Sequence, residues 1–337
     1  MWSLTFGGIK QIAFCATVTF ILNRVVVVSA QDFGYEGQHG PQHWAEDFKR
    51  CSGKFQSPIN IDELSVVEKE FPDLEYNNID VIPKRVHMGN NGHTVVVKMK
   101  FEKGREPSMM GGPLERKSQY QFEQFHFHWG QNDTVGSEDL VNNHAYPAEL
   151  HVVMRSLDFK DFQSALGQDH GVAVLAFFFS IDEEDNPNYE EFVKSLSIIS
   201  GKGMWITLQN LLPLSKFLSW DLVSYYSYVG SLTTPPCAEK VVWIDFQIAI
   251  PISEKQINHF RELTLHDYHL RNNFRPPQPI NDRIIYENVP RKFVQLGYSA
   301  IPFVNADNAA EKCSKGGGIV LILVCYVINS LFTCTKF

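Results

Sequence analysis

The stretch QYQFEQFHFHWG, Gln119–Gly130, decides how this chain folds, because it places two histidines in an aromatic run at a spacing of two residues. Side chains two residues apart share a face of a β-strand, whereas on a helix they point roughly 200° apart. Read as a strand, the run has one apolar face, formed by Phe125, Phe127 and Trp129. The opposite face holds Tyr120, Phe122, Gln124, His126 and His128. The two imidazoles are therefore expected to face a polar space and not a packed core.

A second segment, PAELHVV at Pro147–Val153, repeats this arrangement. Glu149 and His151 share a strand face, as Gln124 and His126 do in the first segment. In both cases a hydrogen-bond acceptor stands two residues before a histidine. A metal-bound imidazole needs such a partner, because the acceptor fixes the tautomer and the orientation of the ring.

The two segments are separated by about 20 residues that include the turn-rich run GQNDTVGSED, so they are expected to be antiparallel neighbours. His126, His128 and His151 then converge on one point. Three neutral histidine ligands with an open fourth position are typical of a catalytic zinc site, since structural zinc sites close all four positions, usually with cysteine. The alternative is a group of histidines that are hydrogen-bonded to their neighbours in a polar cleft.

Short β-branched and aromatic runs dominate the rest of the chain and predict strands at Thr94–Phe101, Ala148–Ser156, Gly171–Ile181 and Lys240–Ile250. Gly171–Ile181 lacks alternation, which predicts a central strand buried on both faces. Helices are expected at Asn188–Ile199 and at Ser253–Leu263, where Ser253 and Gln256 form a capping box. The predicted fold is mainly β with a few surface helices, in a single domain around a large central twisted, mostly antiparallel sheet.

The first 30 residues have the pattern of a signal peptide. Lys10 precedes an apolar stretch, and the small residues Val28 and Ala30 predict cleavage before Gln31. A transmembrane anchor is the alternative, but the apolar stretches are short and are interrupted at residues 23–24.

The C-terminal end predicts a glycosylphosphatidylinositol (GPI) anchor. Small residues around Asn308 precede the polar spacer Glu311–Gly318 and a short apolar tail that starts at Ile319. Asn308 is the expected attachment residue, with Ser314 or Asp307 as alternatives. Residues 291–308 would then be a C-terminal extension, and residues 309–337 would be removed. A weak C-terminal membrane helix is the competing interpretation.

This trimming leaves two of the six cysteines, Cys51 and Cys237, in the mature chain. In an oxidising compartment such a pair predicts one disulfide that closes a long loop, and two free thiols are the alternative. The sequon at Asn132–Thr134 predicts N-glycosylation of Asn132.

Length and charge limit the possible classes of function. The mature chain of about 280 residues is long enough for one large domain. The net charge of −8, with acidic and basic residues interspersed, argues against a nucleic-acid partner.

Seven motifs together resemble the α-class carbonic anhydrases: GPQHW, FQSPINI, GNNGH, QFHFHWG, GSED, AELHVV and GSLTTPP. They occur in the family order, and the resemblance covers residues from about Asp32 to about Tyr286, which places the catalytic domain at residues 31–290. The signal peptide, the cysteine pair and the C-terminal signal resemble the extracellular, GPI-anchored branch. The resemblance therefore implies a location on the outer face of the plasma membrane, with secretion or a short C-terminal helix as alternatives.

The resemblance implies one Zn²⁺ ion held by His126, His128 and His151, and reversible hydration of CO₂ to bicarbonate and a proton by attack of a zinc hydroxide. Thr233 would accept a hydrogen bond from that hydroxide and donate its own proton to Glu138. His93 would be the proton shuttle, a task suited to an imidazole that titrates near neutral pH.

Further positions match the substrate pocket and the water path of the family. The apolar wall for CO₂ would be formed by Val153, Val174, Leu232, Val241 and Trp243, and the backbone of Thr233 and Thr234 would border the substrate and bicarbonate. Tyr35 and Asn91 would line the water path. In the family the peptide bonds before Pro58 and Pro236 can be cis.

Val96 departs from the pattern, because many members carry a polar residue at this position. Its apolar side chain is expected to alter the water path to the shuttle but not zinc binding. Two other functions compete with CO₂ hydration, namely a non-catalytic adhesion or receptor module of the same fold and a zinc-dependent ester hydrolase. The sequence leaves the oligomeric state open.

Overall fold

A computed structural model describes residues 33–115, 118–265 and 268–289 of the chain. The predicted signal peptide, the C-terminal extension and the segment that contains Asn308 lie outside the described residues. Within them, no helix is both long enough and apolar enough to cross a membrane.

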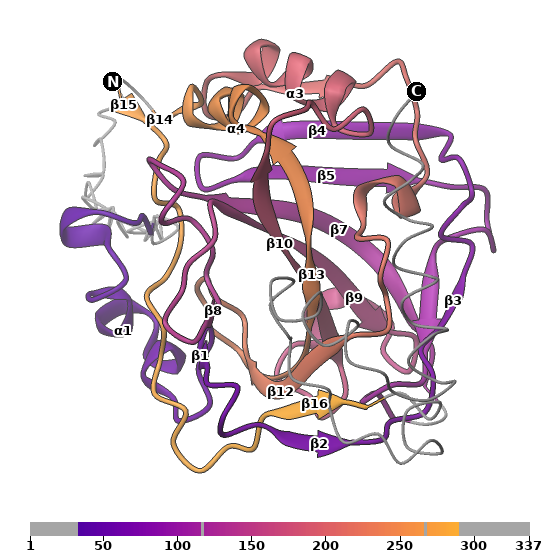
Figure 1. The fold of residues 1–337 in the computed structure, drawn as a ribbon, viewed down its shortest axis with the longest axis vertical. Coiled ribbons are helices and arrows are strands. Elements are labelled where there is room, and N and C mark those ends of the chain that lie inside the picture. The colour runs from indigo at the N-terminus through magenta and orange to yellow at the C-terminus, as the bar shows by residue number, and fades with distance from the viewer. Residues whose placement is uncertain (1–32, 116–117, 266–267, 290–337) are drawn as a thin grey trace, which may run out of the picture.

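The structure is organised around one sheet of twelve strands (Figure 1). In chain order these strands are β2 (Val67–Lys69), β3 (Glu75–Asn77), β4 (Arg85–Asn90), β5 (Val95–Lys100), β6 (Ser108–Met110), β7 (Tyr120–Trp129), β9 (Ala148–Ser156), β10 (Val172–Asp182), β11 (Trp205–Thr207), β12 (Tyr225–Ser231), β13 (Glu239–Ser253) and β16 (Tyr286–Asn288). Two small sheets pair β1 (Asn60–Ile61) with β8 (Leu140–Val141) and β14 (Thr264–Leu265) with β15 (Tyr268–His269).

The main path of the sheet runs β11-β4-β5-β7-β9-β10-β13-β12-β16-β2, and β3 and β6 pair beside β7. Within the described part of this sheet, only the β10–β13 and β16–β2 pairs are parallel. The prediction of a large, mostly antiparallel sheet in a mainly β domain is therefore confirmed. The predicted strand segments are all present, although β13 extends to Ser253, three residues beyond the predicted end.

Strand β10 lies in the middle of the sheet between β9 and β13, as the absence of alternation predicts. Its residues Ala173, Leu175, Phe177 and Phe179 belong to a large hydrophobic core on one face of the sheet. Val172, Val174 and Ala176 belong to a smaller core on the other face. We call these the large core and the small core.

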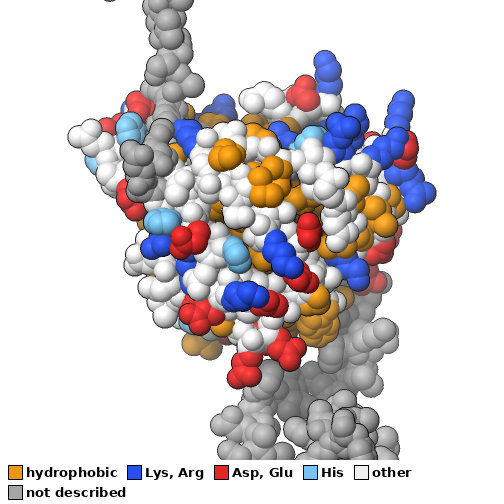
Figure 2. Space-filling view, turned by 90° about the horizontal axis from the view of Figure 1, so that it is seen from above, with side chains coloured by type: hydrophobic (Ala, Val, Ile, Leu, Met, Phe, Trp, Pro, Cys, Tyr) orange, Lys and Arg blue, Asp and Glu red, His pale blue; other side chains and the backbone are white. Residues whose placement is uncertain are grey.

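Short helices lie at the edges of the sheet, and the two longest cover the large core. The α-helices are α1 (Trp44–Asp47), α2 (Phe162–Ala165), α3 (Glu190–Leu196) and α4 (Glu254–Arg261), and the 3₁₀ helices are η1 (Gly37–His39), η2 (Lys49–Ser52), η3 (Ser197–Ile199) and η4 (Leu214–Phe217). Ser253 caps α4 in the predicted capping box with Gln256. The face over α3 and α4 carries interspersed acidic and basic side chains (Figure 2).

The aromatic side of β7 packs into the large core beneath these helices. The ring of Phe127 lies 5.1 Å from the rings of Phe192 on α3 and Phe260 on α4, measured between centroids. Phe125 and Trp129 are fully buried in the same core. The predicted apolar face of β7 is thus confirmed.

The assignment of Tyr120 and Phe122 to the histidine face is wrong. The pairing of β7 with β9 shifts between Phe122 and Gln124, which leaves Glu123 as an extra residue on β7. Such a β-bulge reverses the alternation, because one inserted residue moves all preceding side chains to the other face. Tyr120 and Phe122 accordingly lie in the large core, on the same side as Phe125.

The disulfide prediction is confirmed. Cys51 and Cys237 form a bond with an S–S distance of 2.03 Å, and Trp44 packs against the pair in a small separate cluster. The peptide bonds before Pro58 and Pro236 are both cis.

Candidate metal centre

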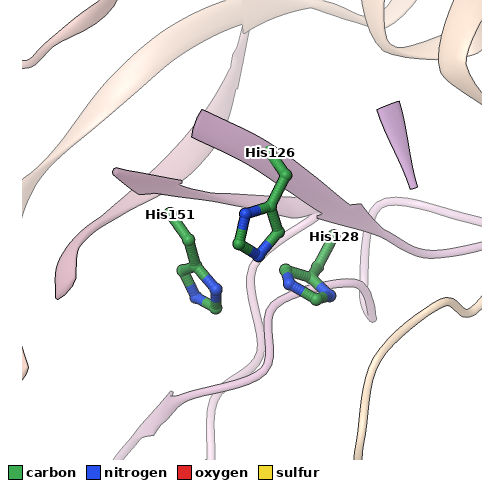
Figure 3. A group of neighbouring side chains, drawn as sticks. All are labelled: His126, His128 and His151. Carbon is green, nitrogen blue, oxygen red and sulfur yellow. The ribbon is translucent and has the colours of Figure 1, made fainter. Parts of the chain in front are cut away.

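Neighbouring strands β7 and β9 bring the three histidines together (Figure 3). His126 is paired directly with His151, and His128 lies one strand step further along β7 on the same face. The centroids of the three rings are 4.6–5.2 Å apart. The predicted convergence of the imidazoles thus follows from the register of two adjacent strands.

Each imidazole uses one of its two ring nitrogens in a hydrogen bond within the protein. His126 Nδ1 donates to Gln124 Oε1 at 3.1 Å, and His151 Nε2 donates to Glu149 Oε1 at 2.7 Å, as the sequence predicts. His128 Nδ1 donates to the backbone oxygen of Asn273 at 2.7 Å. Because a carbonyl oxygen only accepts, this bond leaves His128 Nε2 with its lone pair directed elsewhere.

One ring nitrogen of each histidine lies within 4.8 Å of one ring nitrogen of each of the other two, which is close enough for one ion to bind all three. His128 Nε2 is buried and has no hydrogen-bond partner among the described residues. Three imidazole nitrogens form a donor set that suits zinc, copper or nickel better than magnesium or calcium. The residues present therefore fit a transition-metal ion.

Burial keeps the three imidazoles neutral, which is the form that binds a metal. Burial is the main cause that lowers the pKa of His126 and His128 well below its usual value, and the neighbouring imidazoles lower it further. Burial alone lowers the pKa of His151 to about 3. No proton therefore competes with a cation for these nitrogens at neutral pH.

Glu138 lies next to the histidine cluster and is fully buried. Its Oε2 is 3.4 Å from His128 Nε2, and its Oε1 accepts a hydrogen bond of 2.7 Å from the backbone N–H of Arg275. Burial raises the pKa of Glu138, and hydrogen bonds from the Thr233 side chain and the Arg275 backbone lower it in part. A hydroxyl that donates to a carboxyl keeps its lone pairs as acceptors, so Thr233 can donate to Glu138 and still accept a hydrogen bond.

Glu149 links the backbone of Glu138 and Asp139 to His151. Its Oε2 accepts hydrogen bonds from the backbone N–H groups of Glu138 and Asp139, at 2.8 and 3.0 Å, while its Oε1 accepts from His151. Burial raises the pKa of Glu149 to about 8, against the lowering by these two backbone bonds.

An apolar wall borders the histidine cluster on the small-core side. The ring of Trp243 packs edge-on against that of His151 at 4.9 Å. The predicted wall residues Val153, Val174, Val241 and Trp243 are all buried in the small core, and Leu232 packs against them. Thr234 follows Thr233 in the loop after β12 and is partly exposed.

His93 lies half-buried in the turn between β4 and β5, and its carbonyl accepts a hydrogen bond from Asn273, whose backbone oxygen accepts from His128. Asn91 shapes this turn, because its side-chain oxygen accepts hydrogen bonds from the backbone N–H groups of His93 and Thr94. The ring of Phe33 stacks on His93 at 3.9 Å. A cavity of about 270 Å³ opens there, lined by His93, Phe33 and Tyr35 among others.

The remaining predicted positions are placed as follows. Burial, followed by the charge of Glu138, raises the pKa of Tyr35, so its hydroxyl stays protonated near the site. Val96 on β5 is paired directly with His126, which puts an apolar side chain beside that ligand position. Asn132 is exposed, and its Oδ1 accepts hydrogen bonds from the Thr134 backbone and hydroxyl.

Residues of the loop at 270–276 also support the site, and no sequence motif indicates them. Asn273 accepts from His128 through its backbone, accepts from the Trp129 N–H at 2.7 Å and donates to the His93 carbonyl at 2.9 Å. Arg275 supplies the backbone bond to Glu138. These contacts join residues more than 130 positions apart and have no periodic signal in the sequence.

Comparison with known proteins agrees with this geometry. Residues 39–289 match the family model described as eukaryotic-type carbonic anhydrase. The chain is 31% identical over 318 residues to carbonic anhydrase 15 of Mus musculus, covering 90% of this chain and 94% of that protein. It is 36% identical over 265 residues to carbonic anhydrase 7 of Homo sapiens, covering 75% of this chain and 96% of that protein.

Proposed function

The chain belongs to the eukaryotic-type carbonic anhydrase family and is a carbonic anhydrase, and we propose that it hydrates CO₂ reversibly at the cell surface with one zinc ion held by His126, His128 and His151. One observation carries the zinc assignment. Three neutral imidazoles, of which His128 and His151 are buried and His126 is partly buried, converge while their other nitrogens are each engaged by an acceptor.

Zinc, when bound, is a Lewis acid that lowers the pKa of water in its open fourth position. The contribution of the protein is to hold the ligands in one orientation. Gln124, Glu149 and the Asn273 carbonyl do this by fixing the tautomer of each ring.

Thr233 and Glu138 orient the attacking water. In this assignment the Glu138 carboxyl accepts the hydrogen bond that the Thr233 hydroxyl donates, so the Thr233 oxygen can only accept a hydrogen bond from the water. This directs a water lone pair toward the substrate carbon. Arg275 keeps Glu138 in place by donating from its backbone. The Thr233 and Thr234 backbone would border the substrate and the product bicarbonate.

The substrate CO₂ would lie against the wall of Val153, Val174, Leu232, Val241 and Trp243. An uncharged linear molecule offers few hydrogen bonds, so an apolar wall next to the metal is a suitable binding surface. The edge-on contact between Trp243 and His151 supports this assignment.

His93 would carry the proton released by each hydration from the site to the solvent, through water lined by Tyr35 and Asn91. Its place in the lining of a surface cavity, together with Tyr35, supports this assignment. The outward proton transfer should be slower than with a polar residue at position 96, because Val96 cannot hydrogen-bond to water beside His126.

We propose residues 31–290 as the extracellular catalytic domain, following a cleaved signal peptide and preceding residues 291–308 and a GPI anchor on Asn308. The Cys51–Cys237 disulfide supports an oxidising compartment. The exposed Asn132 sequon supports N-glycosylation. Release of activity from intact cells by a phosphatidylinositol-specific phospholipase is expected, and retention after that treatment would favour a membrane helix.

The decisive experiment measures zinc content and CO₂ hydration on the same purified protein. One equivalent of zinc and hydratase activity that is lost on chelation are expected. One equivalent of zinc without hydratase activity would instead support a non-catalytic surface module. Zinc-dependent ester hydrolysis without CO₂ hydration would support the hydrolase alternative.

A further inference from the structure

Asp245 is an acidic residue within the otherwise apolar run Val241–Phe246 of β13, and it is 0% exposed. Its strand neighbours Ile244 and Phe246 belong to the large core. Strand alternation therefore points Asp245 to the other face, with Trp243 and toward the metal centre.

The sheet places Asp245 in the same row as a metal-ligand position. Asp245 is paired with Ala176 on β10, and Ala176 is paired on its other side with His151 on β9. On the outer side, Asp245 is paired with Tyr226 on β12. One strand therefore separates Asp245 from His151.

Neither carboxyl oxygen of Asp245 has a hydrogen-bond partner among the described residues. The charges that act on it most strongly, on Asp139 and Glu149, are both negative. Burial first, and these two charges second, raise the pKa of Asp245 well above its usual value. A buried carboxylate with neither donor nor cation is too costly to persist, because nothing replaces its hydration.

Asp139 is a fully buried carboxyl that has one satisfied and one unsatisfied oxygen. Its Oδ1 accepts from the Ile59 N–H at 2.8 Å and from the Tyr228 hydroxyl at 3.1 Å. Its Oδ2 has no donor among the described residues. Tyr228, two positions along β12 from the partner of Asp245, feels the charge of both aspartates, which places the two carboxyls in one buried region.

We propose that Asp245 is a neutral carboxylic acid whose proton is hydrogen-bonded to Asp139 Oδ2, so that the two aspartates carry one negative charge and not two. This hydrogen bond gives Asp139 Oδ2 a donor. It needs one proton, which stays covalently bonded to Asp245. In other proteins, too, two carboxyls that share a site keep one proton, because two negative charges held close together repel each other.

This pair acts on the metal centre through the backbone of Asp139. The Asp139 N–H donates to Glu149 Oε2 at 3.0 Å, and Glu149 holds His151. The titratable groups that interact electrostatically with Asp245 are Asp139, Glu149 and Tyr228, and Tyr226 is its strand partner. Asp245 is therefore a positioning residue that limits the negative charge around Glu149. This role rests on the function proposed above, whereas the protonation of Asp245 does not.

Infrared spectroscopy of the zinc-loaded enzyme, with ¹³C-labelled aspartate side chains, tests the protonation directly. At pH 7.5 the wild type should show the carbonyl stretch of a protonated aspartic acid, and Asp245→Asn should remove it. Asp169→Asn is the matched control, because it removes an exposed aspartate at a surface ion pair. Absence of the band from the wild type, or its retention in Asp245→Asn, would overturn the proposal.

Unfolding in urea at pH 6, 7 and 8 gives a second test that needs no catalysis. An aspartate in the unfolded chain loses its proton near pH 4, whereas the folded protein is proposed to keep it. Folding then takes up one proton, so the unfolding constant of the wild type should rise about tenfold per pH unit relative to Asp245→Asn. Zinc release contributes equally to both proteins. Parallel pH dependences would overturn the proposal.

The hydratase pH profile tests the positioning role. Asp245→Asn keeps a neutral donor to Asp139 and should leave the profile unchanged. Asp245→Val removes that donor and should shift the profile. Identical profiles for the two variants would show that Asp245 does not influence the metal centre, even if the infrared band assigns its proton correctly. Asp245→Ser, which retains a small donor, replaces Asp245→Val if that variant does not fold. Its pH profile should lie between the profiles of the wild type and Asp139→Asn. Coincidence of all three profiles would overturn the positioning role.

Discussion

His126 on β7 and His151 on β9 are directly paired residues of adjacent antiparallel strands, with ring centroids 5.2 Å apart and ring planes at 89°. The hydrogen-bond register of two strands therefore sets the distance between two ligand positions. His128 joins them because strand periodicity returns the chain to the same face after two residues. A site built on paired strands in the middle of a sheet is more rigid than one built on loops.

Removal of one imidazole should abolish metal binding at this site. His126→Ala, His128→Ala and His151→Ala are each expected to lose zinc and to reduce hydratase activity to background, because two nitrogens do not complete the ligand set. Atomic absorption and a CO₂ hydration assay measure both effects. His87→Ala, on β4 and partly buried, is the control and should retain one zinc per chain. A fully active His128→Ala enzyme would contradict the assignment.

Removing or reversing the hydrogen bond between Thr233 and Glu138 should slow catalysis while zinc stays bound. Thr233→Val removes the acceptor, and Glu138→Gln presents an amide that donates to the Thr233 oxygen and occupies it. We expect a loss in kcat of about 10²-fold for each, which is typical of a misoriented reacting group. Thr207→Val on β11 is the matched control. Unchanged kcat in both variants would exclude an orienting role for this pair.

Removal of the His93 imidazole should affect proton transfer alone. His93→Ala is expected to lower kcat in weak buffer, to keep the rate of CO₂–bicarbonate interconversion at chemical equilibrium, and to recover when imidazole is added. His269→Ala is the control, because His269 lines the same cavity in another segment. If weak-buffer turnover does not change in His93→Ala, the proton leaves by another route.

A polar side chain at position 96 should improve the water path. Val96→Asn places an amide opposite His126, where it can hydrogen-bond to water. The expected result is a higher kcat in weak buffer with unchanged zinc content, and Val96→Leu, which stays apolar, should show no gain. A decrease in Val96→Asn would indicate that the valine favours the path.

The His151 imidazole should lower the stability of the metal-free protein in acid. The pKa of His151 is about 3 in the folded chain, against 6.5 as its ordinary value in the unfolded chain. Between these values the unfolded state binds more protons at this residue, so the contribution of His151 to stability is present above about pH 6.5 and is lost as the pH falls toward 3. His126 and His128 act in the same direction. Urea midpoints of chelated protein at pH 5 and 7 measure this effect.

Burial raises the pKa of Glu149 and of Asp245, so these carboxyls stabilise the folded state as the pH falls and oppose the histidines. The contribution of His151 is therefore the difference between the wild type and His151→Gln, because Gln does not titrate. Relative to the wild type, His151→Gln should gain stability from pH 7 to pH 5. A difference that does not depend on pH would show that the His151 imidazole does not stay neutral without metal.

The β-bulge at Glu123 shows where alternation alone fails. The pattern from Gln124 to Trp129 assigns each side chain to its observed face, but the same pattern assigns Tyr120 and Phe122 to the wrong one. An extra residue in one strand is stabilised by its pairing with the partner strand and leaves no mark in the local sequence.

Asp245 illustrates the opposite case, in which the sequence contains a signal whose meaning is tertiary. One acid in an apolar strand is visible in the run KVVWIDFQIAI. Its position near Asp139, about 100 residues earlier, depends on the pairing of β13 with β10 and β12. The strand pattern identifies the anomaly, but only the sheet identifies its neighbours.

By itself, the sequence determined the mainly β fold, the strand face that carries His126 and His128, the third histidine with its acceptor Glu149, and the cysteine pair. These depend on local periodicity and on short motifs, which act within a few residues. Only the tertiary structure decided the acceptor for His128, the backbone support of Glu138 by Arg275 and the environment of Asp245. Such contacts join distant segments, and their free energy arises from burial and hydrogen bonding that exist only after the sheet has formed.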